Sequence, residues 1–346
     1  MPELNIDLLK RLCETPGIAG REDAVRALVR DEMAGLVDEL RTDALGNVIG
    51  VRRGSGGPRV LLAAHMDEIG FMVKHIDERG FIRFQPVGGF DPSRLPAQRV
   101  TVHAFDGATY RGAISVAGKP IHLQAAHEVK PPTIDDLFVD ISLDGDAACA
   151  AVEVGDMITL DRTLELAGAN IMSKALDDRV GLFIILETLR SLGEMTRAEV
   201  IAVATTQEEV GVRGAKTAAW ALQPEIGIAL DITPAGDFPG APEEFVGVRL
   251  GGGVAIKVMD TGAISDHSLN QQLRQVASEH NIPFQLEILG RGGTDASAIQ
   301  RSRSGVRATA LSIPVRYAHT VNELCAVSDV RAAIGLLTLY LKGLEG

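Results

Sequence analysis

The stretch RVLLAAHMD, residues 59–67, decides the fold because an uninterrupted apolar run ends there in polar residues. An apolar run without alternation predicts a central strand that is buried on both faces of a parallel sheet. Ligands of open α/β sheets bind beyond the carboxyl ends of such strands. His65 and Asp67 therefore mark the edge of the sheet at which we expect a functional site.

Helical and strand patterns alternate on either side of this stretch, and such alternation predicts a layered α/β domain. Leu8, Leu9 and Leu12 recur at helical spacing near the N-terminus. The strands expected downstream are AEVIAVATT (198–206), EIGIALDI (225–232), FQLEIL (284–289) and ATALSIPV (308–315). The helices expected there are DDRVGLFIILETLRSLG (177–193, amphipathic), SDHSLNQQLRQVASEH (265–280) and SDVRAAIGLLTLYLKGLE (328–345).

Residues 69–161 have a different character. Their segments are short, alternating or β-branched, and are separated by Gly, Pro or Asp, with no helix longer than about two turns. This pattern predicts a small β-barrel or sandwich. We expect one α/β domain, residues 1–68 and 162–346, interrupted by a β-rich insertion, residues 69–161.

Length and charge narrow the possible partners. The chain has 346 residues and a formal net charge of −12, from 34 basic and 46 acidic residues. An acidic surface repels phosphate backbones, so we expect no nucleic-acid partner. No run approaches the roughly 20 apolar residues that a membrane helix needs, so we expect no membrane association.

The N-terminal segment and the cysteines favour a cytoplasmic location. The segment MPELNIDLLKRLCETPG (1–17) mixes acids and bases, and therefore predicts an amphipathic helix and no signal peptide. Cys13, Cys149 and Cys325 are odd in number, widely spaced and set among apolar neighbours, which predicts reduced packing residues. Trp220, the only tryptophan, is expected in the core.

Several polar residues stand at the ends of apolar strands or just before a helix: His65, Asp67, Asp177, Asp178, Glu208, Glu209, Asp231 and His319. Taken singly, each acid is explained by helix capping or by solvation in a loop. Taken together, two histidines and at least three carboxylates form a set that suits zinc, cobalt or manganese. Five ligands exceed the four of a structural zinc and fit two ions that share one carboxylate. The pattern predicts a dinuclear hydrolase site, in which a bridging water is activated.

Five strings in order carry a family resemblance: AHMDEIGFMV (64–73), KALDDRVG (174–181), TTQEEVGVRGA (205–215), GRGGTDASAI (290–299) and IPVRYAHT (313–320). They resemble the cytosolic metallo-aminopeptidases that include glutamyl aminopeptidases and the tetrahedral TET aminopeptidases. GFIRFQPVGGFD, GKPIHL, DLFVDI and VEVGDMITL resemble that family's dimerisation domain. The resemblance implies a zinc-peptidase-like α/β/α sandwich interrupted by a small, PDZ-like β-barrel.

The resemblance also implies a ligand set for two divalent metal ions per subunit, with zinc first and cobalt or manganese as alternatives. His65 and Asp231 would complete the shell of one ion, and Glu209 and His319 that of the other. Asp177 would bridge the two ions.

Asp177 is preferred to Asp178 for the bridge because it lies four residues before Gly181, as the bridging Asp does in related zinc peptidases. For this pair of acids, helix capping stays open as an explanation.

The remaining roles that the resemblance implies concern catalysis. Asp67 would accept a hydrogen bond from the second nitrogen of His65 and so fix its tautomer. Glu208 would be the general base and would return its proton to the leaving amine. Neighbouring side chains on a straight strand point to opposite faces, so Glu208 and Glu209 need an irregular turn, which Gly211 makes plausible. Gly293, Thr294 and Asp295 would line the substrate pocket, although a tight turn with a capping Asp explains them equally well.

The resemblance also bears on substrate choice, and the assembly follows from it alone. Short peptides are the expected substrates, with a preference for leucine-like N-terminal residues because few basic residues flank GGTDASAI (292–299) apart from Arg291 and Arg301. Either arginine would instead recognise glutamate in a glutamyl aminopeptidase. The family builds dimers through the insertion, and six dimers form a tetrahedral dodecamer.

Two other functions stay open. One is a related dinuclear zinc carboxypeptidase or deacylase, whose inserted domain is usually an α+β lid. The other is a non-catalytic peptide-binding scaffold. Glu208 argues against a scaffold, because it is not expected to bind a metal ion and a structural metal site does not need a base.

Overall fold

The computed structural model describes residues 4–119, 123, 130–193, 196–242 and 247–344. Residues 120–122 of the string GKPIHL therefore lie outside the described residues. By its internal packing the chain forms two compact units. The α/β unit comprises Met1–Glu68, Thr163–Ala318 and Asn322–Gly346, and the barrel unit comprises Ile69–Arg162 and His319–Val321.

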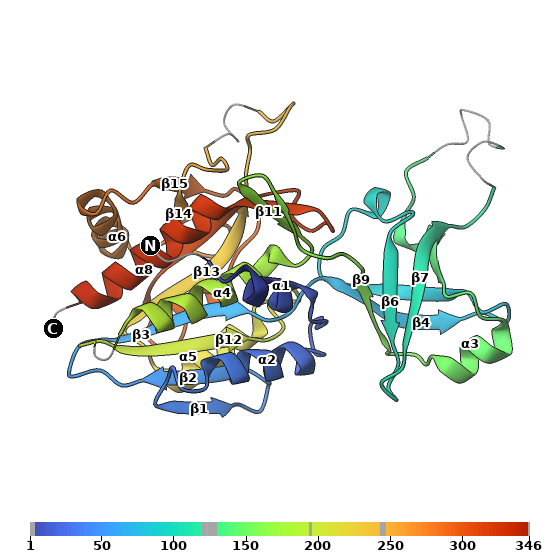
Figure 1. Ribbon diagram of the computed structural model, residues 1–346, viewed down its shortest axis with the longest axis horizontal. Coiled ribbons are helices and arrows are strands. Elements are labelled where there is room, and N and C mark those ends of the chain that lie inside the picture. The colour runs from blue at the N-terminus through green and yellow to red at the C-terminus, as the bar shows by residue number, and fades with distance from the viewer. Residues whose placement is uncertain (1–3, 120–122, 124–129, 194–195, 243–246, 345–346) are drawn as a thin grey trace. The chain divides into compact units, whose positions relative to one another are not determined.

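One large mixed sheet forms the centre of the α/β unit (Figure 1). Its strands are β1 Glu39–Thr42, β2 Val48–Arg52, β3 Arg59–His65, β10 Glu165–Ala167, β11 Asn170–Ser173, β12 Glu199–Thr205, β13 Ile226–Pro234, β14 Val254–Met259, β15 Phe284–Ile288, β16 Arg307–Arg316 and β17 Glu323–Ala326. The main path runs β1-β2-β12-β3-β13-β16-β17-β11-β10, with β14 on β16 and β15 on β14. The four strands β12, β3, β13 and β16 are parallel neighbours, so their carboxyl ends share one edge.

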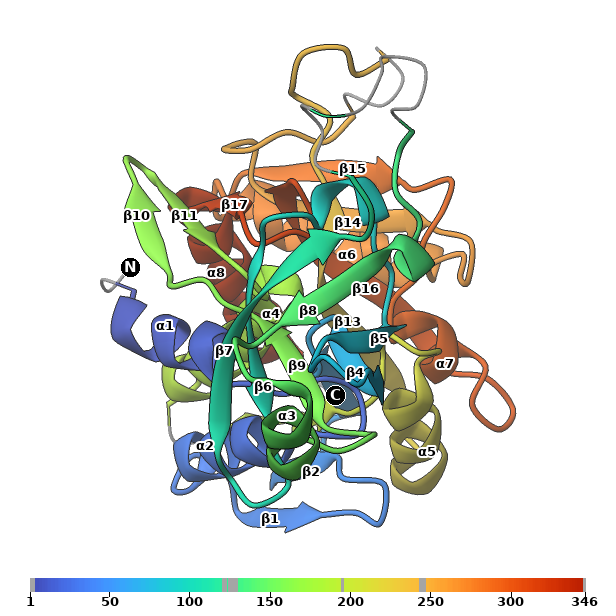
Figure 2. The same cartoon turned by 90° about the vertical axis from the view of Figure 1, so that its right-hand side faces the viewer.

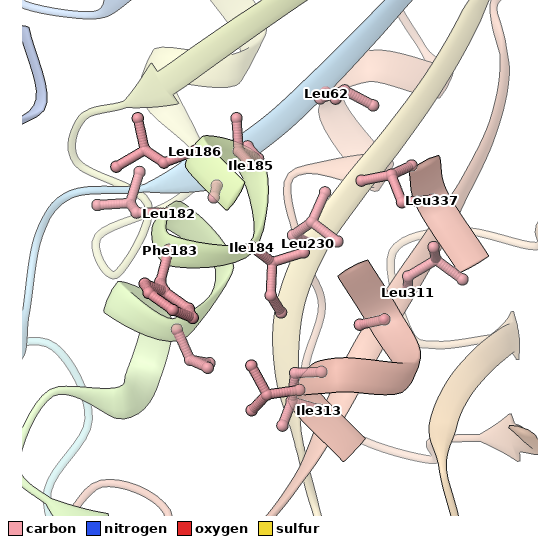
Figure 3. Packing of buried hydrophobic residues seen from close by; sticks show 14 of the residues in the cluster. Leu62, Leu182, Phe183, Ile184, Ile185, Leu186, Leu230, Leu311, Ile313 and Leu337 are labelled. Atoms are coloured by element: carbon pink, nitrogen blue, oxygen red, sulfur yellow. The ribbon is translucent and has the colours of Figure 1, made fainter. Parts of the chain in front are cut away.

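Helices cover both faces of this sheet. They are α1 Ile6–Glu14, α2 Asp23–Met33, α4 Leu176–Ser191, α5 Arg213–Leu222, α6 His267–Glu279, α7 Ala296–Gln300 and α8 Val327–Gly343. Alternate residues of β3 separate the faces: Val60 and Leu62 pack in the cluster with α1, α2, α4, α6 and α8, whereas Leu61 packs with α5 and α7. Figure 3 shows part of the larger cluster, with side chains of α4, α8 and the central strands. The result is three layers, which confirms the predicted α/β class.

The barrel unit is a closed six-stranded barrel in the order β4-β5-β8-β7-β6-β9, whose strands can be followed in Figure 2. Its elements are β4 Gly70–Ile76, β5 Ile82–Val87, η1 Pro92–Arg94, β6 Arg99–His103, β7 Thr109–Val116, η4 Ile134–Asp136, β8 Leu137–Asp140, α3 Gly145–Ala151 and β9 Met157–Leu160. Phe71 is fully buried in the core of the barrel. Its ring centroid lies 4.6 Å from that of Phe84 and 4.4 Å from that of Phe90. Of the two folds expected for the insertion, a barrel or a sandwich, the structure has the barrel.

Three expectations about packing were wrong. Helix α4 is buried on nearly all sides instead of being amphipathic, because both the sheet and neighbouring helices cover it. Trp220 is 60% exposed, and the guanidinium of Arg303 lies 4.2 Å from its ring centroid. Cys149 is exposed, whereas Cys13 and Cys325 are buried as expected. Among the helices of the described residues, none has the length and apolar character needed to span a membrane.

Candidate metal centre

The predicted site residues of the α/β unit gather at the carboxyl edge of the parallel strands. His65 is the last residue of β3 and stands opposite Thr205, the last residue of β12. On the other side, β13 pairs with β3 up to Ala229 and Ala63, and Asp231 follows two residues later. This edge is where an open α/β sheet binds its ligands.

His65, Asp177 and Asp231 form a buried group with ligand atoms within 4.8 Å of one another. His65 Nε2 lies 3.1 Å from Asp177 Oδ1, and His65 Nδ1 lies 2.8 Å from the carbonyl oxygen of Asp67. A carbonyl oxygen only accepts, so Nδ1 must donate its proton there. In the neutral ring, Nε2 therefore turns a lone pair toward the site.

Asp67 plays a different part from the one expected. The carbonyl of Asp67, and not its carboxylate, accepts the hydrogen bond from His65, and the nearer carboxylate oxygen lies 3.6 Å from the same nitrogen. The carboxylate instead accepts the backbone N–H groups of Glu208 and Glu209, at 2.9 and 3.0 Å. Asp67 is fully buried, so these bonds are what satisfies its oxygens.

The two neighbouring acids at the start of α4 have separate tasks. Asp178 accepts the backbone N–H of His65 at 3.2 Å and that of Gly181 at 3.0 Å, so it caps its own helix. Asp177 directs an oxygen toward His65 instead. Both residues have non-helical backbone angles, and the peptide bond between them is cis.

Glu209 and Asp177 belong to a second group of candidate ligands, and their carboxylate oxygens lie within 4.8 Å of each other. Asp177 is therefore a member of both groups of candidate metal ligands. Glu208 and Glu209 lie on the turn between β12 and α5, where Gln207 adopts a left-handed φ of +56°. His319 belongs to the short segment that packs with the barrel unit, and its Nδ1 lies 2.9 Å from the carbonyl oxygen of Gly89.

Burial and like charges determine the electrostatics of the site. Burial raises the pKa of Asp231 well above its ordinary value, and the charge of Asp177 raises it further. Burial also raises the pKa of Glu208 well above its ordinary value; His65 opposes this and Asp231 adds to it. For His65, burial lowers the pKa, but the hydrogen bond with Asp177 and the charge of Asp67 raise it more, to well above the ordinary value.

These residues fit a divalent cation. Asp177 and the lone pair of His65 Nε2 are two acceptors only 3.1 Å apart, so they need a proton or a cation between them. Buried carboxylates that repel one another are stabilised by a nearby positive charge. Imidazole nitrogen and carboxylate oxygen are also the donors that zinc and manganese accept.

The predicted substrate residues lie at the start of α7. Gly293 is exposed, whereas Thr294 and Asp295 are buried. Thr205 donates its hydroxyl to Asp295 Oδ2 at 2.5 Å, and burial raises the pKa of Asp295 to about 6. Asp295 does not cap its helix, so the simple capping explanation is wrong for it.

Two supporting residues were not found from the sequence. Glu22, beside the start of α2, accepts the N–H of Gln207 at 3.0 Å, and Asn47 accepts that of Thr206 at 3.1 Å. Both side chains are buried. Nothing in the local sequence indicates these contacts, because they join segments about 160 to 185 positions apart.

Comparison with known proteins identifies the class, a metal-dependent peptidase. The model of the family described as M42 glutamyl aminopeptidase matches residues 46–336. The lysyl aminopeptidase of Pyrococcus furiosus is 37% identical over 348 residues, which cover 98% of this chain and 97% of that one. The chain therefore belongs to the M42 family.

Solved structures agree with this assignment. An aminopeptidase from the archaeon Desulfurococcus kamchatkensis matches with a TM-score of 0.93 and 39% identity, over 97% of this chain and 94% of that one. The TET1 peptidase of Pyrococcus horikoshii, described as able to assemble into a tetrahedron or a large octahedral shell, matches with a TM-score of 0.87 and 32% identity. That match covers 98% of this chain and 99% of the other. The protein is a metal-dependent aminopeptidase that uses divalent metal ions.

Proposed function

We propose that the chain removes N-terminal residues from short peptides at a site for two divalent cations that share Asp177. His65 and Asp231 complete the ligand set of one cation, and Glu209 and His319 that of the other. Zinc is the expected metal, with cobalt and manganese as alternatives. The observation that carries this proposal is the membership of Asp177 in two groups of ligand atoms, one with His65 and Asp231 and one with Glu209.

The cations, when bound, supply Lewis-acid chemistry, because they polarise the scissile carbonyl and acidify water. Glu208 is the group of this chain that handles the proton. Its raised pKa suits a carboxylate that takes a proton from the attacking water and returns it to the leaving amine nitrogen. Asp67 holds Glu208 for this task through the backbone N–H, and holds His65 through its carbonyl.

We further propose that leucine-like N-terminal residues are preferred, with glutamyl specificity as the alternative. Gly293, Thr294 and Asp295 would line that pocket. Arg301 donates its Nε to the carbonyl of Ser297 at 2.9 Å, so its guanidinium already has a partner on α7. Arg291 is exposed and is the remaining basic candidate for binding glutamate.

The working form proposed here is a dimer, built through the barrel unit, that assembles into a tetrahedral dodecamer. The barrel unit exposes Phe105 at 63% and Val154 at 67%, and apolar surface of this kind favours association. The tetrahedral assembly of the Pyrococcus horikoshii relative supports the same proposal. A cytoplasmic location is proposed because all three cysteines are free thiols.

The test is a release assay with Leu-, Glu- and Lys-p-nitroanilides. It compares metal-stripped enzyme, zinc- or cobalt-restored enzyme and the variant Glu208→Gln. We expect metal-dependent release, fastest from the Leu substrate, and a loss of about 10²- to 10⁴-fold in Glu208→Gln with both metals still bound. Glu187→Gln, at a partly exposed position of α4 that pairs with Arg190, is the matched control and should behave as wild type.

Failure would take one of two forms. No release from any of the three substrates by the metal-loaded enzyme would move the assignment to carboxypeptidase or deacylase substrates. Peptide binding without any hydrolysis would favour the scaffold. Fastest release from the Glu substrate would keep the aminopeptidase and replace the leucine preference by the glutamyl alternative.

A further inference from the structure

The turn that carries Glu208 and Glu209 is held by side chains from three other segments. All four consecutive backbone N–H groups of 206–209 donate to side-chain oxygens. The pairs are Thr206 with Asn47 (3.1 Å), Gln207 with Glu22 (3.0 Å), and Glu208 and Glu209 with Asp67 (2.9 and 3.0 Å). The backbone donors of this turn therefore depend on residues outside it.

The carbonyl groups of Thr206, Gln207 and Glu208 in the same turn accept local hydrogen bonds. The N–H groups of Gly211 and Val212 both reach the carbonyl of Glu208 at 2.8 Å, and Gly214 reaches that of Thr206 at 2.9 Å. The start of α5 thus fixes one side of the turn. The other side, with the left-handed residue Gln207, is fixed by the buried carboxylates and Asn47.

Glu22 makes the contacts next to the left-handed residue. Its Oε1 accepts the N–H of Gly20 at 2.9 Å and that of Gln207 at 3.0 Å, and it also accepts the hydroxyl of Thr206. Glu22 stands at the N-cap of α2, yet its side chain makes no capping bond to that helix. A buried carboxylate is costly unless it is hydrogen-bonded or paired, so these three donors on Oε1, together with Arg26 Nη2 at 3.6 Å from Oε2, account for its burial.

The left-handed turn has a direct consequence for catalysis. On a straight strand, Glu208 and Glu209 would point to opposite faces. A non-glycine residue in the left-handed region is disfavoured by about 1 kcal/mol or more, so Gln207 stays there only while its contacts hold it. Misplacing a reacting group by about 1 Å can cost about 10²-fold in rate.

We propose that Glu22 is a positioning residue for the reaction, which holds Gln207 in the left-handed turn and thereby aims Glu208 at the substrate. The proposal rests on the proposed role of Glu208 as the general base. The required property of Glu22 is its acceptor oxygen at a fixed distance, and its charge is dispensable. Asp67 holds the next two N–H groups, so loss of Glu22 loosens the turn without releasing it.

Two conservative variants separate distance from charge. Glu22→Gln keeps an acceptor oxygen in place of Oε1 and removes the charge, whereas Glu22→Asp keeps the charge and withdraws the oxygen by one methylene. Asp329→Glu is the matched control, because Asp329 is also a buried carboxylate, one that accepts two backbone N–H groups, from Gly251 and Gly253 at 2.8 and 2.9 Å. All three variants are made in the full chain, loaded with saturating zinc and checked for metal content and melting temperature.

We expect kcat for Leu-p-nitroanilide to fall about 10- to 100-fold in Glu22→Asp, with KM changed less than about 3-fold. Glu22→Gln should stay within about 3-fold of wild type in both constants, because the hydrogen bonds survive. Asp329→Glu should lower the melting temperature and leave kcat of the folded enzyme unchanged.

Hydrogen exchange supplies a readout that does not depend on activity. The peptide covering 205–213 should exchange faster in Glu22→Asp than in wild type, and at the wild-type rate in Glu22→Gln. This comparison holds even if none of the p-nitroanilides is a substrate, so failure of the proposed function and failure of this inference are distinguishable.

Three results would overturn the inference. The first is wild-type exchange in the 205–213 peptide of Glu22→Asp. The second is a loss of kcat in Glu22→Gln as large as in Glu22→Asp, which would assign the effect to charge. The third is a loss in Glu22→Asp that appears at limiting zinc and vanishes at saturating zinc, which would assign it to metal affinity through Glu209.

Discussion

The two units bury very different side chains. The α/β unit buries a histidine and several carboxylates at one edge of its sheet, among them His65, Asp177 and Asp231. Among the described residues of the barrel unit, the polar side chains that are buried are Asp156 and Thr159 alone. Buried charge is costly, so its concentration at one sheet edge marks the place where function has set the composition.

The core of the barrel unit differs from that of the α/β unit. It is built from aliphatic and aromatic side chains, and both units expose some large apolar residues, such as Phe105 in the barrel unit and Ile288 in the α/β unit. A unit with such a core supports structure and association, whereas the residues that we propose as metal ligands and as the general base belong to the α/β unit, with the exception of His319. Variants that affect one unit and spare the other are therefore the way to test this division.

The largest effect on stability is expected from a matched pair of core variants, Phe183→Ala in α4 and Phe71→Ala in β4. Both rings are fully buried, and each truncation should cost about 3–5 kcal/mol of unfolding free energy. Phe183→Ala should also reduce zinc binding, because α4 carries Asp177. Phe71→Ala should instead weaken self-association, measured by analytical ultracentrifugation.

The distinction between the two units would be wrong if Phe183→Ala and Phe71→Ala had the same effects on zinc binding and self-association. Loss of both zinc ions from Phe71→Ala at temperatures where the α/β unit is folded would show that the barrel supports the whole metal site and not only the one proposed ligand, His319, that packs with it. Zinc binding by Phe183→Ala equal to that of wild type would remove α4 packing from that support. Circular dichroism on both variants verifies that the folded form is being compared.

Thiol labelling sharpens the comparison, because it counts the cysteines that react in the native and in the unfolded protein. Burial raises the pKa of the Cys13 thiol to about 12, and burial likewise raises that of Cys325. Cys149, in the barrel unit, is exposed. An aromatic disulfide reagent should therefore modify one thiol in the native protein and all three after unfolding, because only thiolates react. Rapid labelling that persists in Cys149→Ser would contradict this.

A surface ion pair of the α/β unit should have the smallest effect. Arg316 donates to both carboxylate oxygens of Asp237, at 2.8 and 2.6 Å, and this hydrogen bonding lowers the pKa of Asp237. A lowered pKa in the folded state stabilises the protein above the unfolded pKa of about 4, and this stability is lost as pH falls through the folded value. The pair is partly exposed at the surface, where solvent screens the charges, so it contributes about 1 kcal/mol or less.

Urea denaturation of Asp237→Asn measures this contribution. The variant should be slightly less stable than wild type near neutral pH and equally stable at pH values well below the folded pKa. A difference that grows toward acid pH would show that the sign is wrong.

Local pattern predicted much of the fold, and tertiary packing accounts for what it missed. The apolar run of β3 predicted a central strand because burial on both faces leaves a continuous apolar sequence. The same logic failed for α4, whose few polar residues suggested an exposed face although the helix is enclosed. Strand β14 was not predicted, because the short run that forms it follows three glycines in a segment without clear alternation.

The candidate site shows the same limit at the level of single contacts. Strand ends predicted that His65, Asp231 and the Glu208–Glu209 pair would meet, because parallel neighbours share one edge. The partner of His65 Nδ1 turned out to be a backbone carbonyl, which no residue pattern encodes. Glu22 was missed because its side chain reaches a turn 185 positions away.

Metal occupancy tests the central claim, that two cations share Asp177, most directly. Zinc content per chain is measured by mass spectrometry after equilibrium dialysis of folded wild type, Asp231→Asn and Asp177→Asn. We predict two ions in wild type, one in Asp231→Asn, which loses a ligand from one group only, and fewer than one in Asp177→Asn, which loses the carboxylate common to both groups. Retention of two ions by Asp177→Asn, or a loss no larger than that of Asp231→Asn, would contradict the account.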